Sequence, residues 1–126
     1  MISNKLLNEI DRGRLGLNHG IPMKLPKLES IIDGVTRETY TLILSNSGAG
    51  KTSFALYAYV YRPLMEHLND DDFKVLYFSL EMGEVALYIK LLSIYIFETY
   101  GIQLSFKKIL SREKEYILSD EHYDLV

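Results

Sequence analysis

The sequence predicts an α/β fold in which a partial parallel sheet is flanked by helices. Two apolar runs, residues 40–44 and 74–80, are rich in strand-forming residues. Each run is followed by a segment of helical character, at residues 52–68 and 84–100. Strands that alternate with helices are typical of parallel sheets, whose strands are apolar on both faces.

The chain has the size and composition of one globular domain. It contains 126 residues, of which 48% are hydrophobic and 25% charged, so a packed core is expected rather than disorder. The net charge of −3 does not indicate a nucleic-acid binder. The absence of cysteine excludes disulfides and thiolate metal sites and fits a cytoplasmic protein. No run resembles a signal peptide or a membrane span, so no membrane partner is expected.

The first 20 residues are expected to form a helix and a loop that lead into the domain at residues 21–126. Residues 3–12 can form a short helix with Ser3 as its N-cap. Its three apolar positions are too few to fold alone, so this helix must dock on its own domain or on a neighbouring subunit. These positions are Leu6, Leu7 and Ile10.

Two short predictions precede the first strand. Glycines and prolines keep residues 15–27 in a loop. Residues 28–33 make about two helical turns, which Gly34 ends at a C′ position.

A phosphate-binding loop follows the first predicted strand. Residues 45–52 read S-N-S-G-A-G-K-T, between a strand and a helix. The backbone N–H groups of such a loop cradle a pyrophosphate, and the N-terminus of the following helix adds a positive dipole. Lys51 would supply charge for the β- and γ-phosphates of ATP, and the Thr52 hydroxyl a ligand for Mg²⁺. The residues expected to bind the nucleotide are Ser47, Gly48, Ala49, Gly50, Lys51, Thr52 and Ser53.

Ser45 departs from the usual pattern, which has glycine at this position. A serine makes the turn less freely if its φ must be positive. The alternative is a chance Gly-Lys-Thr in a loop, with a probability on the order of 10⁻⁵ to 10⁻⁴ per position for the full pattern. The strand before the loop and the helix after it favour nucleotide binding.

Within the helix predicted for residues 52–68, Pro63 is expected to cause a kink or an early stop. The acidic turn at residues 69–72 is interpreted as a solvated loop rather than a metal site, because adjacent carboxylates without other ligands rarely form a cage.

Glu81 stands at the end of the second predicted strand. Ligands of open α/β sheets bind outside the carboxyl ends of the strands, so Glu81 and the phosphate-binding loop are expected to share one edge. A carboxylate there can deprotonate the water that attacks a γ-phosphate. The alternative is a carboxylate in the first turn of the next helix, where the helix dipole favours it. Position alone leaves both open.

The C-terminal third is expected to be helical. Residues 84–100 form a long helix that ends at Gly101, with an apolar stripe wide enough for core packing and for a subunit interface. Two short helices with serine caps follow, at residues 105–110 and 119–126. From the first of these helices onward, basic residues are interleaved with glutamates, which favours a solvated face over phosphate contacts. The basic residues are Lys107, Lys108, Arg112 and Lys114.

Residues 45–56, together with the F-S-L-E-M string at residues 78–82, resemble the ATPase core of DnaB-type replicative helicases, phage-encoded members in particular. The resemblance implies a RecA-like P-loop NTPase that uses ATP and Mg²⁺. It implies that Glu81 is the catalytic base and that Lys51 acts on the phosphates. It also implies a homo-oligomeric ring, a hexamer, that acts on single-stranded DNA, in the host cytoplasm if phage-encoded.

Other parts of the family's pattern are not visible before Val126. These are the Mg²⁺-associated aspartate, the γ-phosphate sensor, the DNA-binding loops and the arginine finger. Residues 21–126 are therefore expected to be the N-terminal portion of a RecA-like domain, and this chain alone to bind ATP weakly and to hydrolyse almost none.

Two alternatives to the helicase remain at this point. A RecA-like recombinase or a clock-type ATPase would share the loop and the glutamate. A non-catalytic interaction module would have a degenerate loop that no longer binds nucleotide, which the serine at position 45 would indicate. A kinase is disfavoured because no lid arginines are visible.

Overall fold

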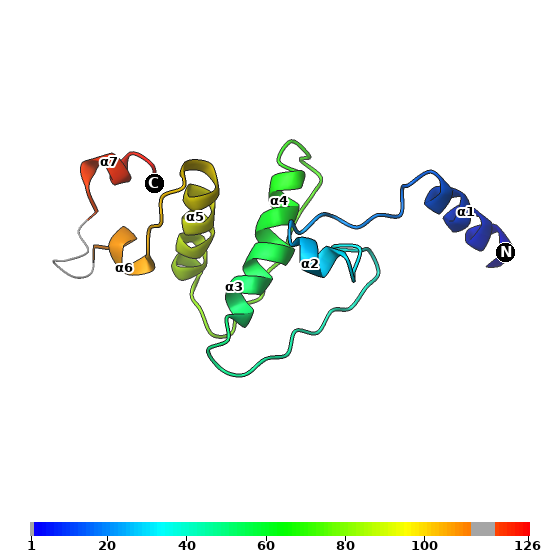
Figure 1. Ribbon diagram of the computed structural model, residues 1–126, viewed down its shortest axis with the longest axis horizontal. Helices are drawn as coiled ribbons and strands as arrows, with labels where there is room; N and C mark the ends of the chain where they lie inside the picture. Colours follow the sequence, from blue (N-terminus) through cyan, green and yellow to red (C-terminus); the bar gives the residue numbers. More distant parts are fainter. Residues whose placement is uncertain (1, 112–117) are drawn as a thin grey trace. The chain divides into compact units, whose positions relative to one another are not determined.

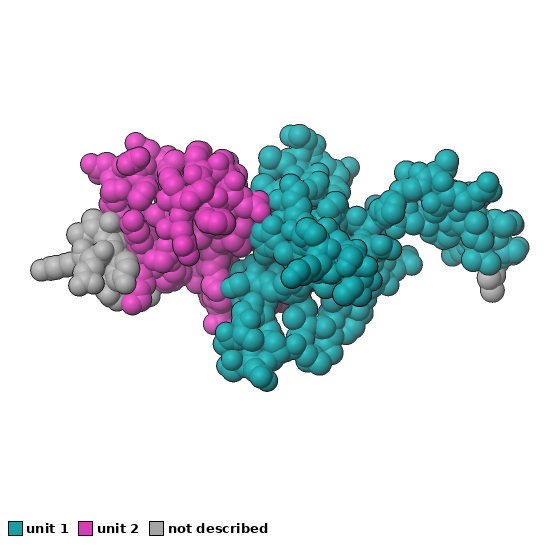
Figure 2. Space-filling model, in the orientation of Figure 1, with its two compact units in different colours: residues 1–75 teal, residues 76–126 magenta. Residues whose placement is uncertain are grey.

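The computed structural model describes residues 2–111 and 118–126. The chain divides into two compact units, residues 1–75 and residues 76–126, which Figure 2 colours teal and magenta. Arg112 and Lys114, which belong to the predicted basic cluster, lie outside the described residues.

The first unit begins with helix α1, Ile2–Arg14 (Figure 1). The helix predicted for residues 3–12 is confirmed. The N-cap prediction for Ser3 is wrong, because the helix already includes Ile2. The apolar side chains that were predicted to share one face, those of Leu6, Leu7 and Ile10, are all exposed.

A backbone clasp closes the segment between α1 and the predicted phosphate-binding loop. Ile21 and Val35 exchange two N–H···O=C hydrogen bonds of 2.9 and 3.0 Å as an isolated antiparallel bridge. The clasp brings Gly20 and Gly34 so close to the opposite backbone that a Cβ on Gly20 would lie 2.1 Å from the Asp33 carbonyl oxygen. Only glycine fits at position 20.

Inside this clasp lies α2, Pro26–Glu29, which is shorter and earlier than the helix predicted at residues 28–33. Pro26 begins it, as proline suits the first helical turn. The Glu29 carboxylate accepts the backbone N–H groups of Met23 and Lys24, and this anchors the fully buried Met23. The prediction that Gly34 ends this helix at a C′ position is wrong, because α2 ends at Glu29 with Ser30 as its C-cap; Gly34 has a positive φ, of 77°, in the clasp instead.

One continuous helical rod follows the phosphate-binding loop (Figure 1). It consists of α3 (Lys51–Ala55), the π-helical segment η1 (Leu56–Tyr61) and α4 (Arg62–Glu66). The helix does not stop at Pro63, because α4 continues to Glu66. Instead the turn before Pro63 widens, with the Arg62 N–H bonded to the Tyr57 carbonyl five residues back. A π-helical turn accommodates a residue that cannot donate to the regular ladder.

The rod supplies most of the buried side chains of the first unit. Leu56, Ala58, Val60 and Tyr61 are buried, as is Pro63. Arg62 is also buried, and its guanidinium pairs with Glu66 one turn later at 2.8 Å. After α4 the chain reverses through residues 67–73, where the rings of His67 and Phe73 stack with centroids 4.2 Å apart.

The predicted parallel sheet is wrong. The described residues form no strand, and the only bridge among them is the Ile21–Val35 pair. Residues 40–44 and 74–80 are irregular, and most of their apolar side chains are exposed, to 80% at Leu44 and 100% at Leu80, whereas Ile43 and Val75 are half-buried. The RecA-like core that the resemblance implied is therefore not formed by these residues.

The physical reason lies in backbone hydrogen bonding. A strand satisfies its N–H and C=O groups only through a neighbouring strand, and a two-stranded arrangement without covered faces is marginal in water. The sequence offers only two such runs. High strand propensity at residues 40–44 and 74–80 thus leads to irregular backbone.

The second unit is built on α5, Glu84–Tyr100, as predicted. Gly101 ends this helix with a φ of 71°, and its N–H bonds to the Phe97 carbonyl at 2.9 Å. The short helices α6 (Phe106–Ile109) and α7 (Asp120–Tyr123) follow. The predicted serine caps are confirmed, because the hydroxyls of Ser105 and Ser119 accept backbone N–H groups of these helices.

The core of the second unit lies between α5 and the segment after it. Ile89, Ile96 and Leu104 are buried, and α6 packs against α5. None of the described helices is both long and apolar enough to span a membrane.

The clasp generates a test of stability. Gly20→Ala forces a Cβ against the Asp33 carbonyl oxygen, so we expect a loss of about 1–3 kcal/mol in the free energy of unfolding. The measurement is urea unfolding followed by circular dichroism.

Gly83→Ala is the matched control, because Gly83 has a φ of −69° and no atom within 4 Å of its Cβ position. Equal losses in the two variants would show that the clasp does not constrain Gly20.

Candidate nucleotide-binding loop

The loop at residues 45–50 is a tight turn that runs directly into the helical rod. The Ala49 N–H bonds to the Asn46 carbonyl at 3.3 Å, and Gly50 is the N-cap of α3. The Phe54 N–H then bonds to the Gly50 carbonyl at 2.9 Å, which closes the first helical turn. The loop therefore presents its backbone at the N-terminal end of a helix, where N–H groups are unpaired and the dipole is positive.

Gly48 and Gly50 have positive φ angles, of 77° and 90°. L-residues with a Cβ adopt this left-handed region at a cost of about 1–2 kcal/mol, so glycine is preferred at both positions. Among the described residues, no heavy atom other than those of the glycine and its two chain neighbours lies within 4 Å of the place where a Cβ would stand on either residue. Other side chains therefore do not cover the loop backbone at Gly48 and Gly50, and a bound group can approach the backbone closely there.

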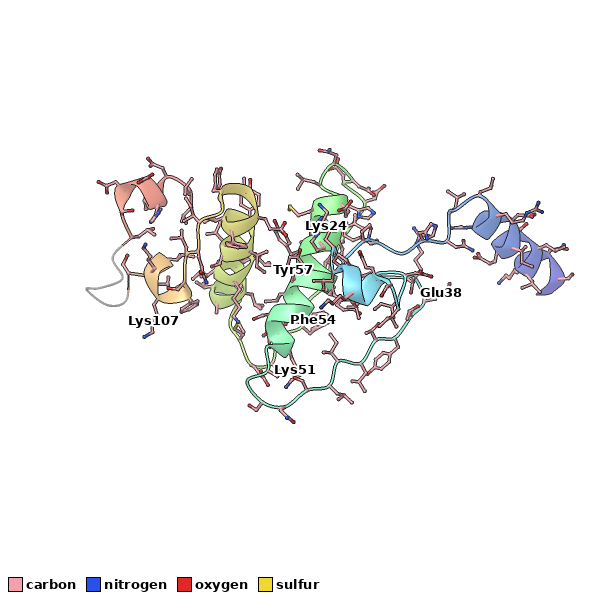
Figure 3. The ribbon with its side chains drawn as sticks, in the orientation of Figure 1. Lys24, Glu38, Lys51, Phe54, Tyr57 and Lys107 are labelled. Atoms are coloured by element: carbon pink, nitrogen blue, oxygen red, sulfur yellow. The ribbon has the colours of Figure 1, made fainter. Side chains whose placement is uncertain are left out.

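Lys51 folds its side chain back over the loop. Its Nζ donates to the carbonyl oxygens of Ser45 at 3.1 Å and of Asn46 at 3.4 Å. Figure 3 shows Lys51 where the loop enters the helix, one turn before Phe54. The ammonium group is exposed and held by two neutral acceptors, so a phosphate, which is charged, would compete for it effectively.

The remaining loop residues complete the surface. Ser47 and Ala49 are exposed small residues within the turn, and Ser53 is exposed in the first turn of α3. Thr52, the residue after Lys51, is half-buried in the same helical turn. Its hydroxyl oxygen is therefore next to Lys51 in the sequence. The structure brings all seven sequence-predicted loop residues together in one turn and the helix start that follows it.

Ser45 does not need the backbone freedom of glycine. Its φ is not positive, unlike those of Gly48 and Gly50, and its hydroxyl donates to the Asn46 carbonyl at 3.2 Å. The departure from the usual pattern therefore places no strain on the loop. Asn46 was missed by sequence reasoning, although its carbonyl organises the turn by accepting both Ala49 N–H and Lys51 Nζ.

Glu81 belongs to the second unit, residues 76–126, whereas the loop at residues 45–50 belongs to the first. Its side chain is exposed, in a turn that joins residues 73–79 to α5. It precedes α5 rather than lying in its first turn, where Glu84 stands. The strand that was expected to deliver Glu81 to a sheet edge is not formed.

The donor set fits a nucleotide better than a protein-bound metal. No group of three His, Cys, Asp or Glu side chains that could hold a metal gathers within the described ranges. Residues 69–72 form an acidic turn, in which Asp70 Oδ1 accepts the backbone N–H of Asp72 at 3.1 Å. The loop offers instead backbone N–H groups, one ammonium and one threonine hydroxyl, which together suit a phosphate chain.

Comparison with known proteins identifies the family. No curated protein and no solved structure matches the chain. The family model of the DnaB-like helicase C terminal domain matches residues 20–113, which include both the loop at residues 45–50 and Glu81. This match covers most of the sequence and confirms the resemblance to DnaB-type helicases. The chain belongs to the family of DnaB-like helicase C-terminal domains.

Proposed function

We propose that this chain is the ATP-binding part of a ring-forming replicative DNA helicase, which couples ATP hydrolysis to DNA unwinding. The observation that carries the proposal is the bare loop of residues 45–50, with Lys51 folded over it at the start of a helix. Membership of the DnaB-like family supports the choice of a helicase over other ATPases.

In this proposal the loop holds the phosphates of ATP. The N–H groups at the start of α3 would donate to the phosphate oxygens, and Lys51 would exchange its two carbonyl acceptors for the β- and γ-phosphates. The Thr52 hydroxyl would provide one oxygen ligand for Mg²⁺, which commonly binds at nucleotides through few protein groups. The metal, when bound, neutralises charge on the phosphates.

Glu81 is proposed as the general base. Its carboxylate accepts a proton from water as the water oxygen forms a bond to the γ-phosphorus. The bond from the γ-phosphorus to the bridging oxygen breaks, its electron pair leaves with ADP, and inorganic phosphate is released. The exposed position of Glu81 in a turn leaves the carboxylate accessible to water.

The assembly proposed is a homo-oligomeric ring, a hexamer, in the cytoplasm of the cell or of a phage-infected host. The exposed apolar side chains of Leu6, Leu7 and Ile10 on α1 would dock on the next subunit, with residues 1–20 as the linker to the ATPase portion. Because the chain carries a net charge of −3, single-stranded DNA would be held elsewhere in the ring.

Calorimetric titration of Mg·ATP separates the two proposed roles. In Lys51→Ala the nucleotide loses a charge-assisted partner worth about 1.5–3 kcal/mol, so Kd rises roughly 10- to 150-fold. Glu81→Gln removes only the base, and we expect its Kd to stay within about threefold of the unmodified chain.

Lys27→Ala removes an exposed lysine of the same unit away from the loop and is the charge-matched control. If the folded chain shows no binding, or if Lys27→Ala weakens binding as much as Lys51→Ala, the loop is not the nucleotide site.

Ser45→Gly tests whether the loop is degenerate. Since Ser45 has no positive φ, restoring glycine relieves no strain, and we expect nucleotide affinity to change by less than about twofold. Stability should fall by about 0.5–1 kcal/mol, because glycine loses more entropy on folding. The measurements are the same titration and urea unfolding.

A gain in affinity of about tenfold in Ser45→Gly would show that serine at this position impairs the loop. It would favour the alternative in which the natural loop has lost its function and the chain is an interaction module.

A further inference from the structure

A single hydroxyl closes the turn that carries Glu81. Ser79 Oγ accepts the backbone N–H of Met82 at 3.0 Å and donates to the carbonyl oxygen of Met82 at 2.6 Å. Glu81 lies between these two residues in sequence and therefore inside the closed turn. Ser79 is half-buried, whereas Glu81 is exposed.

The rest of the turn holds Glu81 weakly. In the part of the chain that the structure describes, the backbone groups of Leu80 and Glu81 make no hydrogen bond of their own, and Leu80 is fully exposed. On the far side, Gly83 is the N-cap of α5 without a side-chain cap, and its carbonyl accepts the Leu87 N–H at 3.2 Å. The Ser79 hydroxyl and the start of α5 thus fix the turn from its two ends.

We propose that Ser79 is a positioning residue for Glu81 in ATP hydrolysis. The inference rests on the proposed function, in which Glu81 is the base. A general base works only within hydrogen-bond reach of the proton that it takes, and a misplacement of about 1 Å can cost about 100-fold in rate. By bonding both polar groups of the Met82 backbone, Ser79 restricts the positions that the Glu81 carboxylate can reach.

Ser79 acts on the turn and not on the substrate. Its hydroxyl is already engaged as both donor and acceptor within the turn. Loss of the hydroxyl should therefore affect the proton transfer and leave the phosphate-binding loop, which belongs to the other unit, unchanged. A purely structural role would instead lower nucleotide affinity and folding together.

The test is steady-state ATP hydrolysis by the assembled protein, with Mg·ATP affinity measured in parallel. Ser79→Ala is expected to lower kcat about tenfold with KM and Kd unchanged within about twofold. Ser79→Thr keeps a hydroxyl at the same position and should restore most of the rate. Ser93→Ala is the matched control, because the Ser93 hydroxyl also bonds to backbone, at 2.8 Å to the Ile89 carbonyl within α5, and should leave kcat unchanged.

A double variant shows whether Ser79 acts through Glu81. In a Glu81→Gln background, Ser79→Ala should add no further loss of kcat, because the base that it positions is gone. An additive loss, an unchanged kcat in Ser79→Ala, a raised KM, or a deficit that Ser79→Thr shares would each overturn the inference. So would a Ser79→Ala protein that fails to fold, since that result assigns Ser79 a structural role.

Failure of the proposed function is recognised separately. If the unmodified protein neither binds nor hydrolyses ATP, the proposed function fails before any Ser79 variant is measured, and the inference falls with it. Normal binding and hydrolysis with no effect of Ser79→Ala overturns the inference alone.

Discussion

The backbone of a helix satisfies its hydrogen bonds within one segment, whereas the backbone of a strand needs a second strand beside it. This difference determines which parts of the chain are regular. The rod at residues 51–66 and the helix α5 form from local bonds and then bury a few large side chains, such as Leu56 and Ile96. Residues 40–44 and 74–80 have no partner in the described structure and leave Leu44 and Leu80 exposed.

The loop at residues 45–50 keeps its form because it needs no sheet. Its conformation depends on two positive-φ glycines, on the turn that Asn46 organises and on the first bond of the rod. All of these are contacts between residues that are close in the sequence. The rod behind the loop is held in place by buried residues, and its π-helical turn allows it to pass Pro63 without ending. Local structure therefore positions Lys51 without help from distant segments.

Single side chains also substitute for missing regular structure elsewhere. The Glu29 carboxylate anchors the backbone at Met23, and the Ser79 hydroxyl closes the turn at Met82. In both places a side chain satisfies backbone groups that a strand or helix would otherwise satisfy. This explains why irregular segments of the chain still hold particular residues, Glu81 among them, in defined turns.

The sequence by itself determined the parts of this protein whose causes are local. The helices α1 and α5, the serine caps of α6 and α7, and the loop with its glycines and Lys51 follow from short-range patterns, and the F-S-L-E-M string pointed to the right family. Only the tertiary structure decided that residues 40–44 and 74–80 form no strands. The reason is that strand propensity expresses a preference for a pleated, paired environment, and pairing depends on partners that no short stretch of sequence specifies.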